Sequence, residues 1–198
     1  MIYNNYPISD IKTDYFLREL CVGETSQLEN IAITIQSLYF YHDILVSSNL
    51  PKTIEASLCR TIIIMSYSVI EAIVISLGYK LQNSCISCKK KCVCRYYSIS
   101  MFSNINEKVN EKKSFINAND FLSQIGIIYL LSSDKKFYDE YRNSRNNVHL
   151  GRNAEIITKD LYYSKTNCEK TIRFMQEFIR MLNDNFSDFI KNNKCKIV

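Results

Sequence analysis

The segment 141–150, YRNSRNNVHL, holds the side chains best suited to act on a phosphodiester. At about 100° per residue, Arg142 and His149 lie within about 20° of each other on a helix. Arg145 and Asn146 fall on the same stripe. One helix end would therefore present two guanidinium groups, a carboxamide and an imidazole along one face. The apolar face that packs this helix against the protein would consist of Phe137, Tyr141 and Val148.

This combination of residue types suits phosphodiester cleavage without a metal ion. Arginine offers a planar, always-charged fork that matches phosphate, and histidine exchanges protons near neutral pH. His149 could deprotonate a ribose 2′-OH or protonate the leaving oxygen, while Arg142 could neutralise the charge that grows on the phosphorus oxygens. The alternative is a helix C-terminus whose cations suit the helix dipole, with an exposed polar stripe.

The composition indicates which elements must position these residues. The chain has 198 residues, of which 46% are hydrophobic and 23% are charged. This length favours one domain over residues 1–198, and this composition is that of a globular protein. Only 4 Gly and 2 Pro are present, too few for the turns that a β-sandwich needs about every 8–12 residues. The sequence therefore predicts an all-α protein.

Hydrophobic spacing predicts an antiparallel bundle of four to five long helices. Capping boxes at Ser26/Glu29 and Thr166/Glu169 predict two helix starts. Residues 1–23 are expected to be irregular or partly helical, 104–114 to form an exposed helix or loop, and 150–165 to form a loop. The predicted helices span about 26–49, 51–81, 118–131, 135–149 and 166–190. The seam of the last consists of Ile172, Met175, Ile179, Leu182, Phe186 and Phe189.

The apolar run 62–77 is predicted to be a buried core helix rather than a membrane span. It has 16 residues and contains Glu71, whereas a spanning helix needs about 20 apolar residues. No basic segment followed by an apolar one opens the chain, so we expect no signal peptide and a cytoplasmic location without membrane partners. The lone seam residue His42 is expected to belong to the core.

The segment 142–149 resembles the signature of HEPN proteins (higher eukaryotes and prokaryotes nucleotide-binding domain). That signature is an Arg, usually followed by a polar residue, with a His after four to six residues. Arg142, Asn143 and His149 match its six-residue form. Glu71, within the run 68–72, resembles the acidic position of the family, and the order of helices is similar over roughly residues 25–190.

The resemblance implies an all-α homodimer whose two Arg/His faces form one composite cleft. It implies a metal-independent endoribonuclease that leaves a 2′,3′-cyclic phosphate and serves as a toxin or antiviral effector, with an antitoxin or defence partner. His149 would be the acid and base, Arg142 the phosphate-stabilising residue, Asn143 the orienting residue, and Glu71 the brace of Arg142. Some family members are inactive, so a catalytically silent interaction module that binds a toxin, antitoxin or nucleic acid is the alternative.

Two further sets of residues are predicted to contact RNA. Arg145 stands too close to His149 for the signature, so we interpret it, with Asn146, as a substrate contact. The segment 80–95 carries five cations and no carboxylate, and the whole chain has a net charge of +5. This makes it a place for RNA backbone contacts, although a solvated loop fits equally well. The cations assigned to RNA are Lys89, Lys90 and Lys91.

The same insert, residues 83–95, contains four of the 8 cysteines. Four thiolates can saturate a tetrahedral structural zinc, although two CxxC pairs usually stand a dozen or more residues apart. Disulfides or redox-labile thiols, and an insert without specific chemistry, remain as alternatives. Catalysis is expected to need no cofactor. The candidate zinc ligands are Cys85, Cys88, Cys92 and Cys94.

Overall fold

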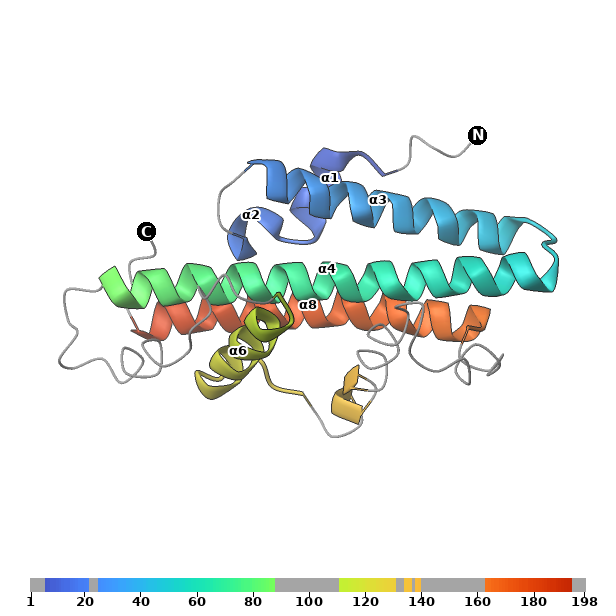
Figure 1. Cartoon of the computed structure of the whole chain (residues 1–198). Helices are drawn as coiled ribbons and strands as arrows, with labels where there is room; N and C mark the ends of the chain where they lie inside the picture. The colour runs from blue at the N-terminus through green and yellow to red at the C-terminus, as the bar shows by residue number, and fades with distance from the viewer. Residues whose placement is uncertain are drawn as a thin grey trace. The chain divides into compact units, whose positions relative to one another are not determined.

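The computed structural model describes residues 6–21, 25–87, 111–130, 134–136, 138–139 and 163–193 (Figure 1). All regular secondary structure within these ranges is helical. The predicted all-α class is therefore confirmed. The described residues belong to two compact units.

Unit 1 comprises residues 1–11, 29–70 and 130–177. It contains most of α3 (Thr25–Ser47) and the first half of α4 (Lys52–Ser87). The apolar seam of α3 is buried at Ile31, Ile35, Leu38 and Leu45, and His42 is half-buried in the same seam. Pro51 ends the connection between the helices, and its carbonyl accepts the first backbone hydrogen bonds of α4. This agrees with the preference of proline for helix starts.

The N-terminal segment of unit 1 contacts α3 through an aromatic ring at Tyr6 and an amide hydrogen bond. The Tyr6 ring stacks on Tyr39 of α3 with centroids 4.6 Å apart, and Gln36 Nε2 donates to the Tyr6 carbonyl at 2.9 Å. Gln176 of α8 (Lys165–Asn193) donates to the Tyr39 hydroxyl at 2.7 Å. Residues 8–14 form the short helix α1 (Ile8–Asp14), so the predicted partly helical lead-in is confirmed.

Helices α4 and α8 run parallel in unit 1. Glu55 forms an ion pair with Lys165 at 3.4 Å, and one turn later the Cys59 and Cys168 thiols lie close enough for each to shift the pKa of the other. Residue numbers thus increase in the same direction along both helices. Helices that are distant in sequence can run parallel in a bundle because long connections return the chain to the same end. The short loop between α3 and α4 carries no information about this direction.

Unit 2 comprises residues 12–28, 71–129 and 178–198. It contains α2 (Leu17–Leu20) and α6 (Glu111–Gln124) with the second halves of α4 and α8. Asn185 of α8 donates to the Ile127 carbonyl at 2.8 Å. The predicted α8 seam is confirmed in both units, because all its six apolar side chains are buried.

Several predicted boundaries were wrong. Helix α6 begins at Glu111 and ends at Gln124, seven residues earlier at both ends than predicted. Gly126 has φ +81 and ends it, since only glycine adopts this conformation without steric cost. Residues 111–114, predicted to form an exposed helix or a loop, are the first turn of α6, because an amphipathic helix accommodates a polar first turn.

The predicted helix starts and the cysteine insert also need correction. Ser26 lies inside α3 and Thr166 inside α8, so neither is an N-cap. Ser164 caps α8 instead: its Oγ accepts the Asn167 N–H at 3.3 Å. Helix α4 continues to Ser87, so Cys85 belongs to a helix and not to a loop. No Gly or Pro follows Gly78 within α4, and nothing local stops the helix earlier.

Residues 52–82 of α4 are long and apolar enough to cross a membrane by composition alone. However, 61% of their most apolar window is buried inside the protein. Ser66 is fully buried there and donates to the Ile62 carbonyl at 2.9 Å, so its hydroxyl is satisfied within the helix. This burial is what the core helix of a soluble protein shows, as predicted for residues 62–77.

Candidate functional site

Most side chains predicted to carry chemistry lie outside the described residues, so their roles stay predictions. Cys85 lies on α4, but its side chain is also outside that set. Glu71 is the one predicted site residue whose side chain is described. The remaining residues outside the described set are the predicted catalytic Arg142, Asn143 and His149, the predicted RNA contacts Arg145, Asn146, Lys89, Lys90 and Lys91, and the predicted zinc ligands Cys88, Cys92 and Cys94.

Glu71 lies near the middle of α4 on a half-buried stripe of this apolar helix. Ile64, Ser68 and Ile75 share the stripe and are half-buried as well. A carboxylate at such a position keeps part of its hydration and avoids the cost of full burial. Glu71 is therefore accessible enough to receive a guanidinium group. A half-buried position would also suit this carboxylate without such a partner, because it avoids the cost of full burial. The opposite, fully buried side of α4 consists of Ser66, Val69, Ile70, Ile73 and Leu77.

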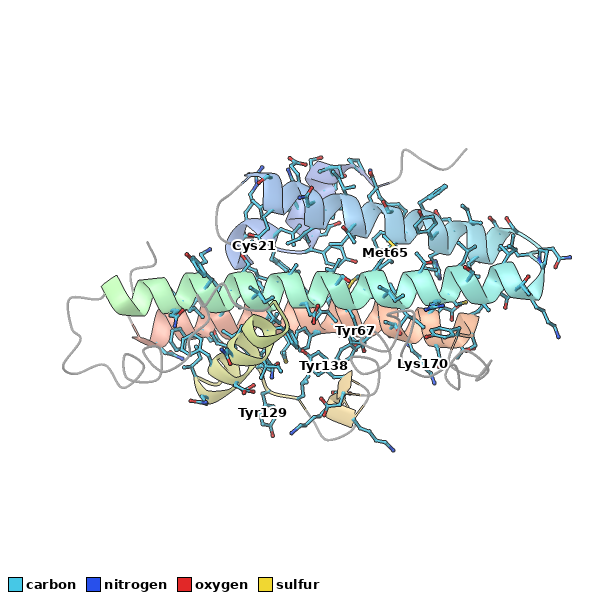
Figure 2. All side chains as sticks on the ribbon, viewed as in Figure 1. Cys21, Met65, Tyr67, Tyr129, Tyr138 and Lys170 are labelled. Atoms are coloured by element: carbon cyan, nitrogen blue, oxygen red, sulfur yellow. The ribbon has the colours of Figure 1, made fainter. Side chains whose placement is uncertain are left out.

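One residue of the predicted fourth helix, Tyr138, belongs to the core of unit 1. Residues 134–136 and 138–139 are helical. Tyr138 is 3% exposed, and its ring lies 6.3 Å from Tyr67 of α4 and 6.1 Å from Phe174 of α8 (Figure 2). Tyr138 thus fixes the start of this segment between two helices. The side chains predicted to pack this helix, those of Phe137, Tyr141 and Val148, lie outside the described residues.

A metal centre is not found among the described residues, where no three His, Cys, Asp or Glu side chains are grouped closely enough to hold an ion. The side chains of the predicted zinc ligands lie outside this set.

Lys80 and Cys21, of which Cys21 is labelled in Figure 2, form a polar cluster in unit 2 that no sequence motif indicated. The Lys80 ammonium donates to the Glu19 carbonyl and, at 3.4 Å, to the Cys21 carbonyl. It also lies 5.7 Å from the Phe186 ring centroid. Lys80 thereby satisfies carbonyls at the C-terminus of α2, where helix carbonyls lack partners and a cation is favoured. Burial lowers the pKa of Lys80, against the opposing effect of Cys21 and Glu19.

The Cys21 thiol in this cluster is 1% exposed. Burial raises the pKa of Cys21 from 9.0 to about 11, although a hydrogen bond with Ser76 and the charge of Lys80 act in the other direction. This thiol therefore stays protonated and unreactive near neutral pH.

We expect the free energy of unfolding to fall as the pH rises from about 9 to about 11, because of Cys21. The folded-state pKa exceeds the unfolded one, so the native state binds more protons in this window and its advantage is lost as the pH passes about 11. Two pKa units correspond to about 2–3 kcal/mol. Urea unfolding of the wild type and Cys21→Ala at pH 8 to 11 measures the difference. Burial lowers the pKa of Lys80, so its titration changes the free energy of unfolding in the opposite direction, and it does so in both proteins. Parallel pH profiles of the two proteins would contradict the assignment of this pH effect to Cys21.

Cys59 and Cys168, two of the cysteines outside the insert, meet in unit 1. Both are 0% exposed, and both are free thiols. They are 109 residues apart, and no spacing rule could pair them; the parallel alignment of α4 and α8 does so.

Comparison with known proteins finds no matching family model, no matching curated protein and no matching solved structure.

Proposed function

We propose that the protein is a metal-independent endoribonuclease of the HEPN type, which acts in the cytoplasm as a homodimer. The observation that carries the proposal is the spacing of Arg142, Asn143 and His149 at the end of a predicted helix. A toxin or antiviral role, with an antitoxin or defence protein as partner, follows from the same resemblance.

The described residues support this proposal in two respects. The chain is all-α, as the family requires. Residues 134–136 and 138–139, which precede the signature in the chain, are helical, and Tyr138 packs against Tyr67 of α4 and Phe174 of α8. A helix anchored in this way can hold a catalytic side chain more precisely than a loop.

The proposed reaction is an attack by the ribose 2′-oxygen on the adjacent phosphorus. His149 takes the 2′-OH proton, and the proton it holds can pass to the leaving 5′-oxygen. Arg142 neutralises the charge that develops on the phosphorus oxygens, and Asn143 orients the pair. Glu71 braces the Arg142 guanidinium. The products are a 2′,3′-cyclic phosphate and a 5′-hydroxyl.

RNA binding would use cations and amides beyond the catalytic pair. Arg145 and Asn146 contact the substrate beside the scissile phosphate, and Lys89, Lys90 and Lys91 contact the backbone. Each cation that neutralises a phosphate releases a counterion, so binding should weaken with salt. Two copies of the stripe in a dimer would supply two Arg/His pairs to one cleft.

The test is RNA cleavage in excess chelator by the wild type, His149→Ala and His42→Ala. We expect the wild type to cleave and leave cyclic phosphate ends, and His149→Ala to lose activity at least about 100-fold, the usual contribution of a general acid or base. The chain has 2 histidines, and His42, half-buried in α3, is the matched control whose replacement should preserve activity.

Equal activity of the wild type and His149→Ala, or no cleavage by either, would contradict the proposal. A folded dimer or heteromer whose biological effect survives Arg142→Ala would then identify a catalytically silent interaction module. Elemental analysis after reduced, anaerobic purification separately tests for structural zinc at Cys85, Cys88, Cys92 and Cys94.

A further inference from the structure

The facing thiols of Cys59 and Cys168 form a second chemical site in unit 1. Cys59 belongs to the second turn of α4 and Cys168 to the first turn of α8. Both side chains are fully buried and both thiols are free, and the two lie close enough for each to shift the pKa of the other. Two thiols in contact within a core differ from the usual buried cysteine, which packs as a small hydrophobic group.

The register of the two helices produces this contact. Glu55 and Lys165 pair at 3.4 Å one turn before the thiols. The Cys168 N–H donates to the Ser164 carbonyl at 3.0 Å, which fixes the backbone at the start of α8. Packed helix axes lie about 8–10 Å apart and Cα atoms about 2.3 Å from each axis, so facing Cα atoms are about 3.5–5.5 Å apart. This overlaps the range of about 4.4–6.8 Å that a disulfide needs.

The surroundings give the two sulfurs different roles. The hydrogen bond from Cys168 lowers the pKa of Cys59, and the nearby charge of Lys165 adds to this effect against burial and Glu55. The same hydrogen bond, together with burial, raises the pKa of Cys168. Cys59 is thus the sulfur that ionises first, and Cys168 is the proton donor that stabilises the thiolate.

We propose that Cys59 and Cys168 are a redox-active pair that a peroxide converts to a disulfide joining α4 to α8. The Cys59 thiolate attacks a peroxide oxygen and breaks the O–O bond, which leaves a sulfenic acid and, after protonation, water. The Cys168 sulfur then attacks the Cys59 sulfur, and its proton leaves with the hydroxyl group as a second water. Two thiols lose two electrons and two protons, and hydrogen peroxide becomes two molecules of water.

Local opening of the start of α8 provides access for the oxidant. Cys168 is the fourth residue of the helix, and terminal turns open at a lower free energy than the core. Oxidation should accordingly be slow in the native protein. A dithiol reductant restores the pair by thiol–disulfide exchange. This proposal does not depend on ribonuclease activity.

The experiment treats the full-length, reduced protein with hydrogen peroxide, blocks remaining thiols in acid and digests it with trypsin without reduction. Cleavage after Lys52 and Arg60, and after Lys165 and Lys170, releases the peptides 53–60 (TIEASLCR) and 166–170 (TNCEK). Each contains one cysteine, so a linked pair identifies the Cys59–Cys168 disulfide without ambiguity.

We expect the linked peptide to appear in the native wild type and to disappear with dithiothreitol. The melting temperature should rise on the order of 10 °C, because the bond closes a loop of over 100 residues. Cys59→Ser and Cys168→Ser should each abolish both effects. Cys21→Ser is the matched control, a buried thiol in unit 2 that should leave both effects unchanged.

Linkage of Cys59 or Cys168 to a different cysteine would overturn the proposal, as would a linked peptide that forms only after unfolding in urea. The peptide assay uses the wild type, so the result stands even where a serine variant fails to fold.

Discussion

Replacing Arg142 by lysine is expected to lower the rate of RNA cleavage about 100-fold or more under saturating substrate. Lysine keeps the positive charge but loses the planar fork that holds two phosphate oxygens at once. Removal of a single donor that stabilises developing charge commonly costs about 10²–10³ in kcat. Single-turnover cleavage of a labelled RNA in chelator measures the chemical step directly.

Arg145→Lys is the matched control for this substitution. Both arginines belong to one segment and share one predicted stripe, so they experience similar changes in charge and volume. We interpret Arg145 as a substrate contact, and its replacement should raise KM with little change in kcat. The opposite result, a loss of kcat in Arg145→Lys and not in Arg142→Lys, would exchange the two roles and refute the assigned signature.

Replacing Tyr138 by alanine is expected to lower the free energy of unfolding by about 3–5 kcal/mol. The side chain is 3% exposed and lies against the rings of Tyr67 and Phe174. Truncation of such an aromatic residue loses both buried area and aromatic contacts, and leaves a cavity. Urea unfolding followed by circular dichroism gives the value.

Tyr129→Ala is the control, because this tyrosine is 72% exposed (Figure 2). Its replacement should change stability by less than about 0.5 kcal/mol. Equal losses in the two variants would show that Tyr138 is not a core residue of unit 1. If the helix beginning at residue 134 carries the catalytic stripe, Tyr138→Ala should also reduce RNA cleavage under conditions in which the protein remains folded.

Periodicity predicted the fold class and the longest helices well. The seam of α8 was predicted residue by residue, and its six apolar side chains are buried. The apolar run around Ile70 was correctly assigned to a core helix. These results follow from local causes: an amphipathic pattern repeats along one element, and it buries the same face whichever partner the helix meets.

Boundaries were predicted less well, since capping depends on which polar group reaches which backbone N–H. Ser164 and Thr166 are both good N-cap residues, and only the position of the chain leading into α8 selects Ser164. Gly126 is a local sequence signal for the end of α6, two residues after its last residue. For Glu71, the sequence indicated a carboxylate in the central helix, and the structure adds its half-buried environment.

The sequence by itself determined an all-α protein, its principal apolar seams and a candidate catalytic segment at 142–149. Tertiary structure alone decided that α4 and α8 run parallel, that Tyr138 packs on Tyr67, and that Cys59 meets Cys168. The physical reason is the range of each determinant. Helix formation and amphipathicity act within one or two turns, whereas these contacts join residues about 70–110 positions apart, and depend on how separate helices pack.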